Sequence, residues 1–142
     1  MPKFDEKAAA EFRRPFEEKG GDIFIALGIT PVEVSEGRAV MKMPFCPNTS
    51  QFTGVFAAGA LISLADITAT AACRNEGKPF PYTVQLSANL LSNTNAGNAT
   101  AESLVVHSGR TMKVVETIVR DDNNNVLIRT TTTHLIVSAG KK

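Results

Sequence analysis

Residues 53–73 read TGVFAAGALISLADITATAAC and form the one long apolar segment of the chain. The segment has few β-branched residues at its centre, and residues 55–74 are long enough for about five helical turns at roughly 3.6 residues per turn. The sequence therefore predicts a helix over 55–74. Because this helix would be apolar nearly all round, we expect it to be buried.

A single carboxylate interrupts this segment. Between Lys42 and Arg74, Asp66 is the only side chain that carries a full charge at neutral pH. A carboxylate is costly to bury without donors or a partner, so we expect Asp66 to face a polar cleft. On the residues alone two interpretations stay open: an exposed or structurally hydrogen-bonded side chain, or a functional group.

The segments around this helix have the patterns of β-strands. Residues 28–45, GITPVEVSEGRAVMKMPF, hold two alternating runs around SEG, which predicts a hairpin. In residues 82–91, YTVQLSANLL, apolar and polar residues alternate as in a sheet with one covered face. Three more stretches follow, separated by the turn signals SGR and DDNNN: ATAESLVVHSG, TMKVVETIVRD and NVLIRTTTTHLIVS. Such short connections predict a largely antiparallel sheet.

The predicted order is a hairpin, one buried helix and a meander of longer strands. A sheet curled around the helix would bury it, because the small residues of the helix let strands approach closely. The stretch DEKAAAEFRRPFEEK, residues 5–19, predicts a short N-terminal helix with Phe12 and Phe16 on one face, which Pro15 kinks or limits. The fold class is therefore α+β, with an antiparallel sheet wrapped around one long central helix.

The size and composition of the chain narrow the choice of class. A chain of 142 residues fits a single domain, 1–142. With 20% charged residues and a formal net charge of +1, it is neither a disordered chain nor a nucleic-acid binder with a broad basic face. The N-terminal stretch lacks the apolar core of a signal peptide, and no apolar run reaches the roughly 18 residues of a membrane span, so we expect a cytoplasmic protein. We expect Cys46 and Cys73 to be buried, reduced packing residues.

The segment GVFAAGALISLAD resembles the signature Gly-x-x-His-Gly-Gly-Ala-Leu, followed by an acidic residue two turns into the helix, of hotdog-fold thioesterases of the PaaI type. The later TVQLSANLL is similar to the next strand of that family, where an Asn-x-Leu element corresponds to Asn89 and Leu91. The resemblance covers residues 22–138. It implies a hotdog fold and a hydrolase that cleaves acyl-CoA or a related acyl-thioester.

The resemblance also implies roles for particular residues. Asp66 would be the nucleophile or the general base, and the backbone N–H of Ala58, at the start of the helix, would be the main oxyanion donor. Gln51 falls where the family commonly has an asparagine that orients the water or the carboxylate, and Thr83 where it often has a hydroxyl residue that assists the water. From the residues alone, Gln51 could equally be a solvent-exposed loop residue.

The remaining predicted contacts are to substrate. We expect Gly59, Asn89, Arg110 and Lys113 to bind it, the two basic residues lying where family members often hold the nucleotide. Arg110 and Lys113 could instead be solvated charges at a strand end. The family histidine is replaced by Ala57, and the usual Arg-Pro after the Asn-x-Leu element by Ser92 and Asn93. These departures keep open a hotdog module that binds an acyl or aromatic ligand without turning it over.

The sequence also leads to expectations about metals, cofactors and partners. A metal site is not expected, because His107 and His134 lack ligand-like spacing, and His134 is expected to be an ordinary half-buried or exposed strand residue. A hydratase on the same fold is a weaker alternative, since no His and acid pair is visible near the helix. The composition gives no reason to expect a nucleic-acid or membrane partner. The resemblance implies no redox cofactor, an acyl-CoA substrate, and a homodimer joined through YTVQLSANLL or a homotetramer made of two such dimers.

Overall fold

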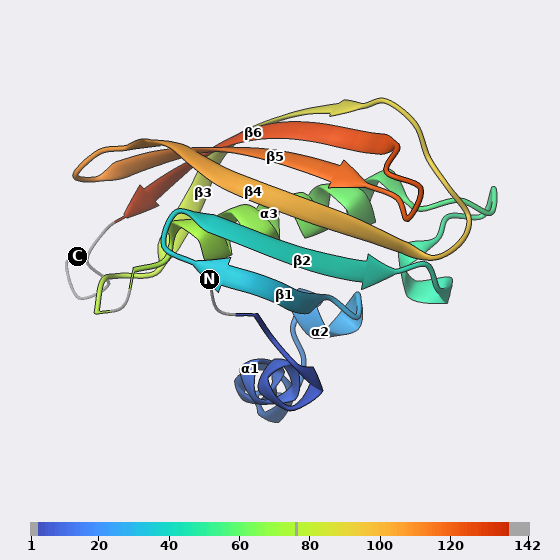
Figure 1. Cartoon of the computed structure of the whole chain (residues 1–142), viewed down its shortest axis with the longest axis horizontal. Helices are drawn as coiled ribbons and strands as arrows, with labels where there is room; N and C mark the ends of the chain where they lie inside the picture. Colours follow the sequence, from blue (N-terminus) through green and yellow to red (C-terminus); the bar gives the residue numbers. More distant parts are fainter. Residues whose placement is uncertain (1–2, 76, 137–142) are drawn as a thin grey trace.

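The computed structural model describes residues 3–75 and 77–136, which form a curved sheet with one long helix against it (Figure 1). The sheet has six strands in the order β1-β2-β4-β5-β6-β3, and every neighbouring pair is antiparallel. This confirms the predicted fold class. The elements are α1 (Glu6–Glu18), α2 (Ile23–Ala26), β1 (Thr30–Ser35), β2 (Arg38–Pro44), η1 (Pro47–Thr49), α3 (Ala58–Cys73), β3 (Pro81–Leu90), β4 (Asn98–Ser108), β5 (Met112–Arg120) and β6 (Val126–Ile136).

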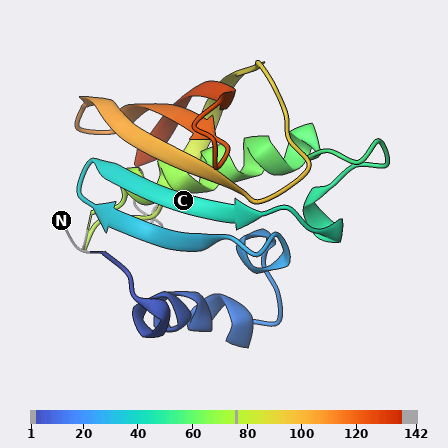
Figure 2. The ribbon, with the colours of Figure 1, turned by 45° about the vertical axis from the view of Figure 1, so that its right-hand side comes forward.

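Helix α3 is the predicted central helix, and the sheet curves around it (Figure 2). Its buried residues are mostly small or aliphatic: Ala60, Leu61, Leu64, Ala65, Thr68, Ala69, Ala71, Ala72 and Cys73. The prediction of burial all round is only partly right. Ile62, Ser63, Asp66, Ile67 and Thr70 are half-buried, so one side of α3 is left uncovered by the sheet of the same chain.

The N-terminal helix α1 lies beside β1, outside the sheet (Figure 1). The Asp5 side chain caps it by accepting from the N–H of Ala8 at 2.7 Å. Phe12 and Phe16 share one face, as predicted, and both rings contact Phe24 of α2. Pro15 does not end the helix, which continues to Glu18.

Helix α2 falls in the stretch between the N-terminal helix and the hairpin, where no helix is predicted. It has a single turn, capped by the side chain of Asp22, which accepts from the N–H of Phe24 at 2.9 Å. One turn is too short to show a helical period in the sequence.

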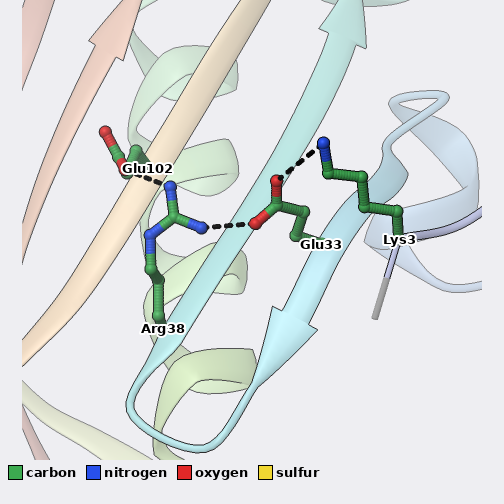
Figure 3. A network of polar contacts seen from close by, with 4 residues as sticks. All are labelled: Lys3, Glu33, Arg38 and Glu102. Atoms are coloured by element: carbon green, nitrogen blue, oxygen red, sulfur yellow. Dashed lines mark hydrogen bonds and ion pairs between the residues drawn. The ribbon is translucent and has the colours of Figure 1, made fainter. Parts of the chain in front are cut away.

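The predicted hairpin is confirmed by β1 and β2, which turn at Glu36 and Gly37. Arg38 holds its outer side together, because the guanidinium group contacts Glu33 of β1 and Glu102 of β4, and Lys3 approaches Glu33 at 4.0 Å (Figure 3). Hydrogen bonding to Glu102, and then to Glu33, raises the pKa of Arg38. The outer edge of β1 is covered, since Phe4 donates a backbone hydrogen bond to Val32 at 3.1 Å.

Strand β3 is not part of a simple meander, which corrects the predicted order. It pairs with β6 and forms the far edge of the sheet. The face predicted as covered is also largely open: Val84 is 55% and Leu90 46% exposed. A bulge between Thr83 and Gln85 interrupts the alternation.

The two cysteines differ. Cys73 is buried at the end of α3, as predicted, but Cys46 is only half-buried. Burial raises the pKa of the Cys73 thiol to about 11, although the nearby charge of Lys113 acts in the other direction. Among the described helices, none has the length and apolar character needed to cross a membrane.

Candidate active site

Asp66 lies in the middle of α3 on the side that the sheet leaves uncovered. Its Oδ1 accepts a hydrogen bond from the hydroxyl of Thr83 on β3, with an oxygen–oxygen distance of 2.6 Å. Among the residues that the structure describes, none donates to Oδ2. One oxygen of the carboxylate is thus fixed by the protein and the other is free to meet a water molecule or a substrate.

A histidine lies directly behind this pair. The Nδ1 of His134 is 3.3 Å from the Thr83 hydroxyl, and its Nε2 is 2.7 Å from the hydroxyl of Thr132. The side chain is fully buried, so the expectation of an ordinary half-buried or exposed residue is wrong. Burial lowers the pKa of His134, and the negative charge of Asp66 acts in the opposite direction.

The start of α3 presents backbone donors. Ala57 is the N-cap and has no side-chain cap, and the described residues accept no hydrogen bond from the N–H groups of Ala58 and Gly59. Both residues are exposed. Free N–H groups at the first turn of a helix form a site suited to a developing negative charge.

Asn93 fixes the entrance to α3, a role that the sequence did not suggest. Its side chain accepts from the N–H of Phe56 at 3.2 Å and donates to the carbonyl of the same residue at 2.9 Å. The N–H of Ala57 donates to the carbonyl of Thr49 at 2.8 Å. These hydrogen bonds with Asn93 and Thr49 fix the turn that leads into α3. They therefore also fix the position of the free N–H groups of Ala58 and Gly59.

Gln51 lies in the tight turn before α3. It is exposed, and its side-chain amide donates to the hydroxyl of Thr53 at 2.7 Å. No contact joins it to Asp66 within the described part of the chain. Gln51 belongs to the same end of the molecule as Ala58, next to the fully exposed Phe52.

The free N–H groups at the start of α3 and the carboxylate of Asp66 are well separated within one chain. Asp66 follows Ala58 by eight residues, and at about 1.5 Å per residue the helix rises about 12 Å over that stretch. A hydrogen bond to an oxyanion spans only about 3 Å. The free N–H groups and the Asp66 carboxylate of a single chain are therefore far apart along α3.

The predicted substrate contacts do not come together either. Gly59 stands beside Ala58, and Arg110 is exposed in the turn between β4 and β5. Asn89 is exposed and lines a polar groove with Arg38 and Arg129, among others, away from α3.

Lys113 is not a solvated charge. It is buried, and its ammonium group donates to the carbonyl of Cys73 at the C-terminus of α3, at 3.3 Å. A cation at this end of a helix is favourable for the helix dipole, so Lys113 has a structural role in this chain.

An apolar cavity of about 190 Å³ opens between α1 and the second half of α3. Its walls are mostly aromatic and aliphatic, and Ile67 and Thr70 connect it to the turn that carries Asp66. The guanidinium of Arg74 lies 5.5 Å from the ring centroid of Phe80 in the same wall. Among the described residues, no three His, Cys, Asp or Glu side chains gather as metal ligands would.

This sheet and its central helix define the class of the protein, the hotdog fold. In solved structures, the fold is similar to that of thioesterase HI1161 from Haemophilus influenzae, with a TM-score of 0.82 at 22% identity over 99% of this chain and 95% of that one. It is also similar to the E. coli PaaI protein from the phenylacetic acid degradation operon, with a TM-score of 0.78 at 21% identity over 92% and 94% of the two chains.

Sequence comparison gives the family. The family model described as Thioesterase superfamily matches residues 53–128, more than half of the chain. The chain therefore belongs to that superfamily. Among curated proteins it is similar to the 1,4-dihydroxy-2-naphthoyl-CoA hydrolase of Listeria monocytogenes, with 26% identity over 103 residues that cover 71% of this chain and 84% of the relative. The protein is thus an enzyme of the thioester-hydrolase class.

Proposed function

We propose that the protein hydrolyses acyl-CoA thioesters with Asp66 as the catalytic carboxylate. The observation that carries the proposal is the state of Asp66: Oδ1 is held by Thr83, no described residue donates to Oδ2, and the residue lies on the open side of the helix. In a member of the thioesterase superfamily, such a carboxylate suits attack on a carbonyl carbon.

Two routes fit a single free carboxylate oxygen. As a general base, Oδ2 takes a proton from water, the hydroxide adds to the carbonyl carbon, the C–S bond breaks, and the proton passes to the leaving thiolate. As a nucleophile, Oδ2 itself adds to the carbon and expels the thiolate, and water then hydrolyses the resulting anhydride. A single turnover in ¹⁸O-labelled water separates them, because label in the enzyme requires the anhydride.

The oxyanion would be stabilised by the N–H groups of Ala58 and Gly59 from a second chain. The 12 Å rise estimated above puts the donors of the same chain out of reach. We therefore propose a homodimer with shared sites, in which one chain supplies Asp66 and the other supplies Ala58 and Gln51. The free edge of β3 supports joining the two sheets there, and two such dimers would form the tetramer.

The apolar cavity lined by Ile67 and Thr70, on the helix that carries Asp66, supports a choice of acyl group. At about 190 Å³ it is smaller than the pockets of roughly 300–1,000 Å³ that hold drug-sized ligands, and its walls include Phe12, Phe16 and Phe80. We propose an aromatic or short acyl group in preference to a long fatty chain. That the Listeria relative is named for a naphthoyl-CoA substrate agrees with this choice.

The test compares hydrolysis of benzoyl-, hexanoyl- and palmitoyl-CoA by the wild type and by Asp66→Asn. The amide keeps the shape of the carboxylate but cannot take the proton, so we expect kcat to fall by at least about 100-fold. Asp5→Asn is the matched control, because asparagine also caps a helix and Asp5, the N-cap of α1, is not among the residues that line the cavity. Equal turnover by wild type and Asp66→Asn would remove Asp66 from the mechanism.

The alternative is a binding module, which Ala57 in place of the family histidine favours. It predicts no turnover of any of the three thioesters, with a rise in Tm when one of them is added.

Shared sites have their own test. Asp66→Asn chains are unfolded together with Gln51→Ala chains and refolded as a mixture. If sites are shared, half of the dimers are mixed and each has one intact site, so roughly a quarter of wild-type activity returns. No recovery would show that each chain is self-sufficient.

A further inference from the structure

A row of polar side chains crosses the sheet under α3. Lys113 on β5, His134 on β6 and Thr83 on β3 are direct neighbours in the strand register. Of these, Lys113 holds the C-terminus of α3, and Thr83 holds Asp66. His134, between them, is fully buried. A buried imidazole needs partners for both ring nitrogens, and this one has them only in Thr83 and Thr132.

With Asp66 ionised and the imidazole neutral, the form that burial favours by lowering the pKa of His134, the hydrogen bonds around His134 can be oriented in only one way. An ionised Asp66 can only accept, so the single hydroxyl proton of Thr83 goes to Oδ1. The oxygen of Thr83 must then accept from Nδ1 of His134, which therefore carries the proton. Nε2 is left as an acceptor and takes the hydroxyl proton of Thr132. The chain runs Thr132 to His134 to Thr83 to Asp66, with a neutral imidazole.

We propose that His134 is a positioning residue for Asp66, acting through Thr83, and that Thr132 selects the imidazole tautomer that this requires. This inference rests on the proposed function of Asp66. A hydroxyl that receives a hydrogen bond from His134 cannot rotate away, so Thr83 keeps Oδ1 engaged and Oδ2 turned toward the substrate.

Two substitutions of His134 separate positioning from mere packing. The side-chain nitrogen of His134→Asn falls near the place of Nδ1 and can still donate to Thr83, whereas the nitrogen of His134→Gln falls near Nε2 and cannot. We expect His134→Asn to keep kcat within about threefold, and His134→Gln to lose at least about tenfold in kcat with KM nearly unchanged. Equal losses in the two variants, or losses that follow Tm, would overturn the proposal.

Thr132 has a matched control on the same strand. Thr132→Val removes the proton donated to Nε2, while Thr132→Ser keeps it. Thr130 faces the same side and is also buried, but its hydroxyl has no partner in the described part of the chain, so Thr130→Val removes no hydrogen bond seen there. We expect lower kcat for Thr132→Val, near wild-type kcat for Thr132→Ser and unchanged activity for Thr130→Val. Equal activity of Thr132→Val and Thr130→Val would contradict the role of Thr132.

The tautomer can be measured without any of these variants. The chain has two histidines, so His107→Gln, at an exposed position, leaves only the signals of His134 in a ¹⁵N-labelled sample. We expect the ¹⁵N shifts of a neutral ring protonated on Nδ1, and a ring protonated on Nε2 would overturn the proposal. The outcomes stay distinguishable: an active Asp66→Asn refutes the proposed function, whereas an inactive Asp66→Asn with a fully active His134→Gln refutes only this inference.

Discussion

At the scale of single residues, Thr83 is the only described residue that donates a hydrogen bond to the carboxylate of Asp66. Thr83→Val keeps the β-branched shape that an edge strand favours but removes the hydroxyl. We expect kcat for the preferred thioester to fall at least about tenfold, since a hydrogen bond to a charged group contributes roughly 1.5–3 kcal/mol. Thr83→Ser should retain most of the activity. Steady-state kinetics on the three proteins checks this, and a fully active Thr83→Val would contradict it.

His134 should also make stability depend on pH. Burial lowers the pKa of the folded imidazole below its ordinary 6.5, so between that lowered value and about 6.5 the unfolded chain binds a proton that the folded chain does not. The free energy of unfolding should therefore fall as the pH drops below about 6.5, and His134→Asn should lack this part of the slope. Urea unfolding of both proteins at pH 7.5 and 5.5 measures the difference, and parallel losses would exclude the effect.

At the scale of the elements, the loop before β4 depends on a glycine. Gly97 has a φ of +74°, and a Cβ there would clash with Oδ2 of Asp122, which accepts from the N–H of Asn98. Gly97→Ala should lower the free energy of unfolding by about 2–3 kcal/mol, through backbone strain and the clash together. Gly37→Ala is the matched control: its φ is +83°, but nothing lies within 4 Å, so only strain of about 1 kcal/mol is expected. Urea unfolding that gives equal losses would exclude the clash.

Local patterns in the sequence predicted the central helix, the hairpin and the antiparallel pairing, because each depends on the period of a short segment. They could not place β3 next to β6, since that pairing joins strands far apart in the chain. They also could not reveal α2, whose single turn has no period. The prediction that one face of β3 is covered is wrong, because alternation shows which residues share a face but not what covers that face.

The residues of the candidate site were also predicted only in part. Asp66 stood out because a charge on an apolar helix needs a partner, and Thr83 came only from the family resemblance. His134 was missed although it alternates with the buried Thr132, because only the register of β6 with β3 puts its ring behind Thr83. Lys113 was misread because its partner, a backbone carbonyl, has no sequence signature.

At the scale of the whole molecule, the proposed dimer can be tested at the edge of β3. Val84 on β3 and Val106 on β4 are both bulged valines, 55% and 51% exposed, but only β3 has an unpaired edge in the described sheet. A charged side chain discourages pairing at an edge, so Val84→Lys should give a folded, inactive monomer. Val106→Lys should remain an active oligomer. Sedimentation velocity and the thioester assay check both, and an active Val84→Lys monomer would rule out shared sites.

The two edges of the sheet are unlike, and this limits how far such a joined sheet can grow. At β1 the backbone is already occupied by Phe4, with α1 alongside, whereas at β3 it is bare. If two copies pair through their β3 strands, the two β1 strands become the outer edges of the joined sheet. Because Phe4 already pairs with β1, a third copy has no β3 edge left with which to pair. In other proteins, an exposed strand edge can pair with one copy after another and so start an open-ended fibre. Here the same kind of edge would be used up by a single pairing.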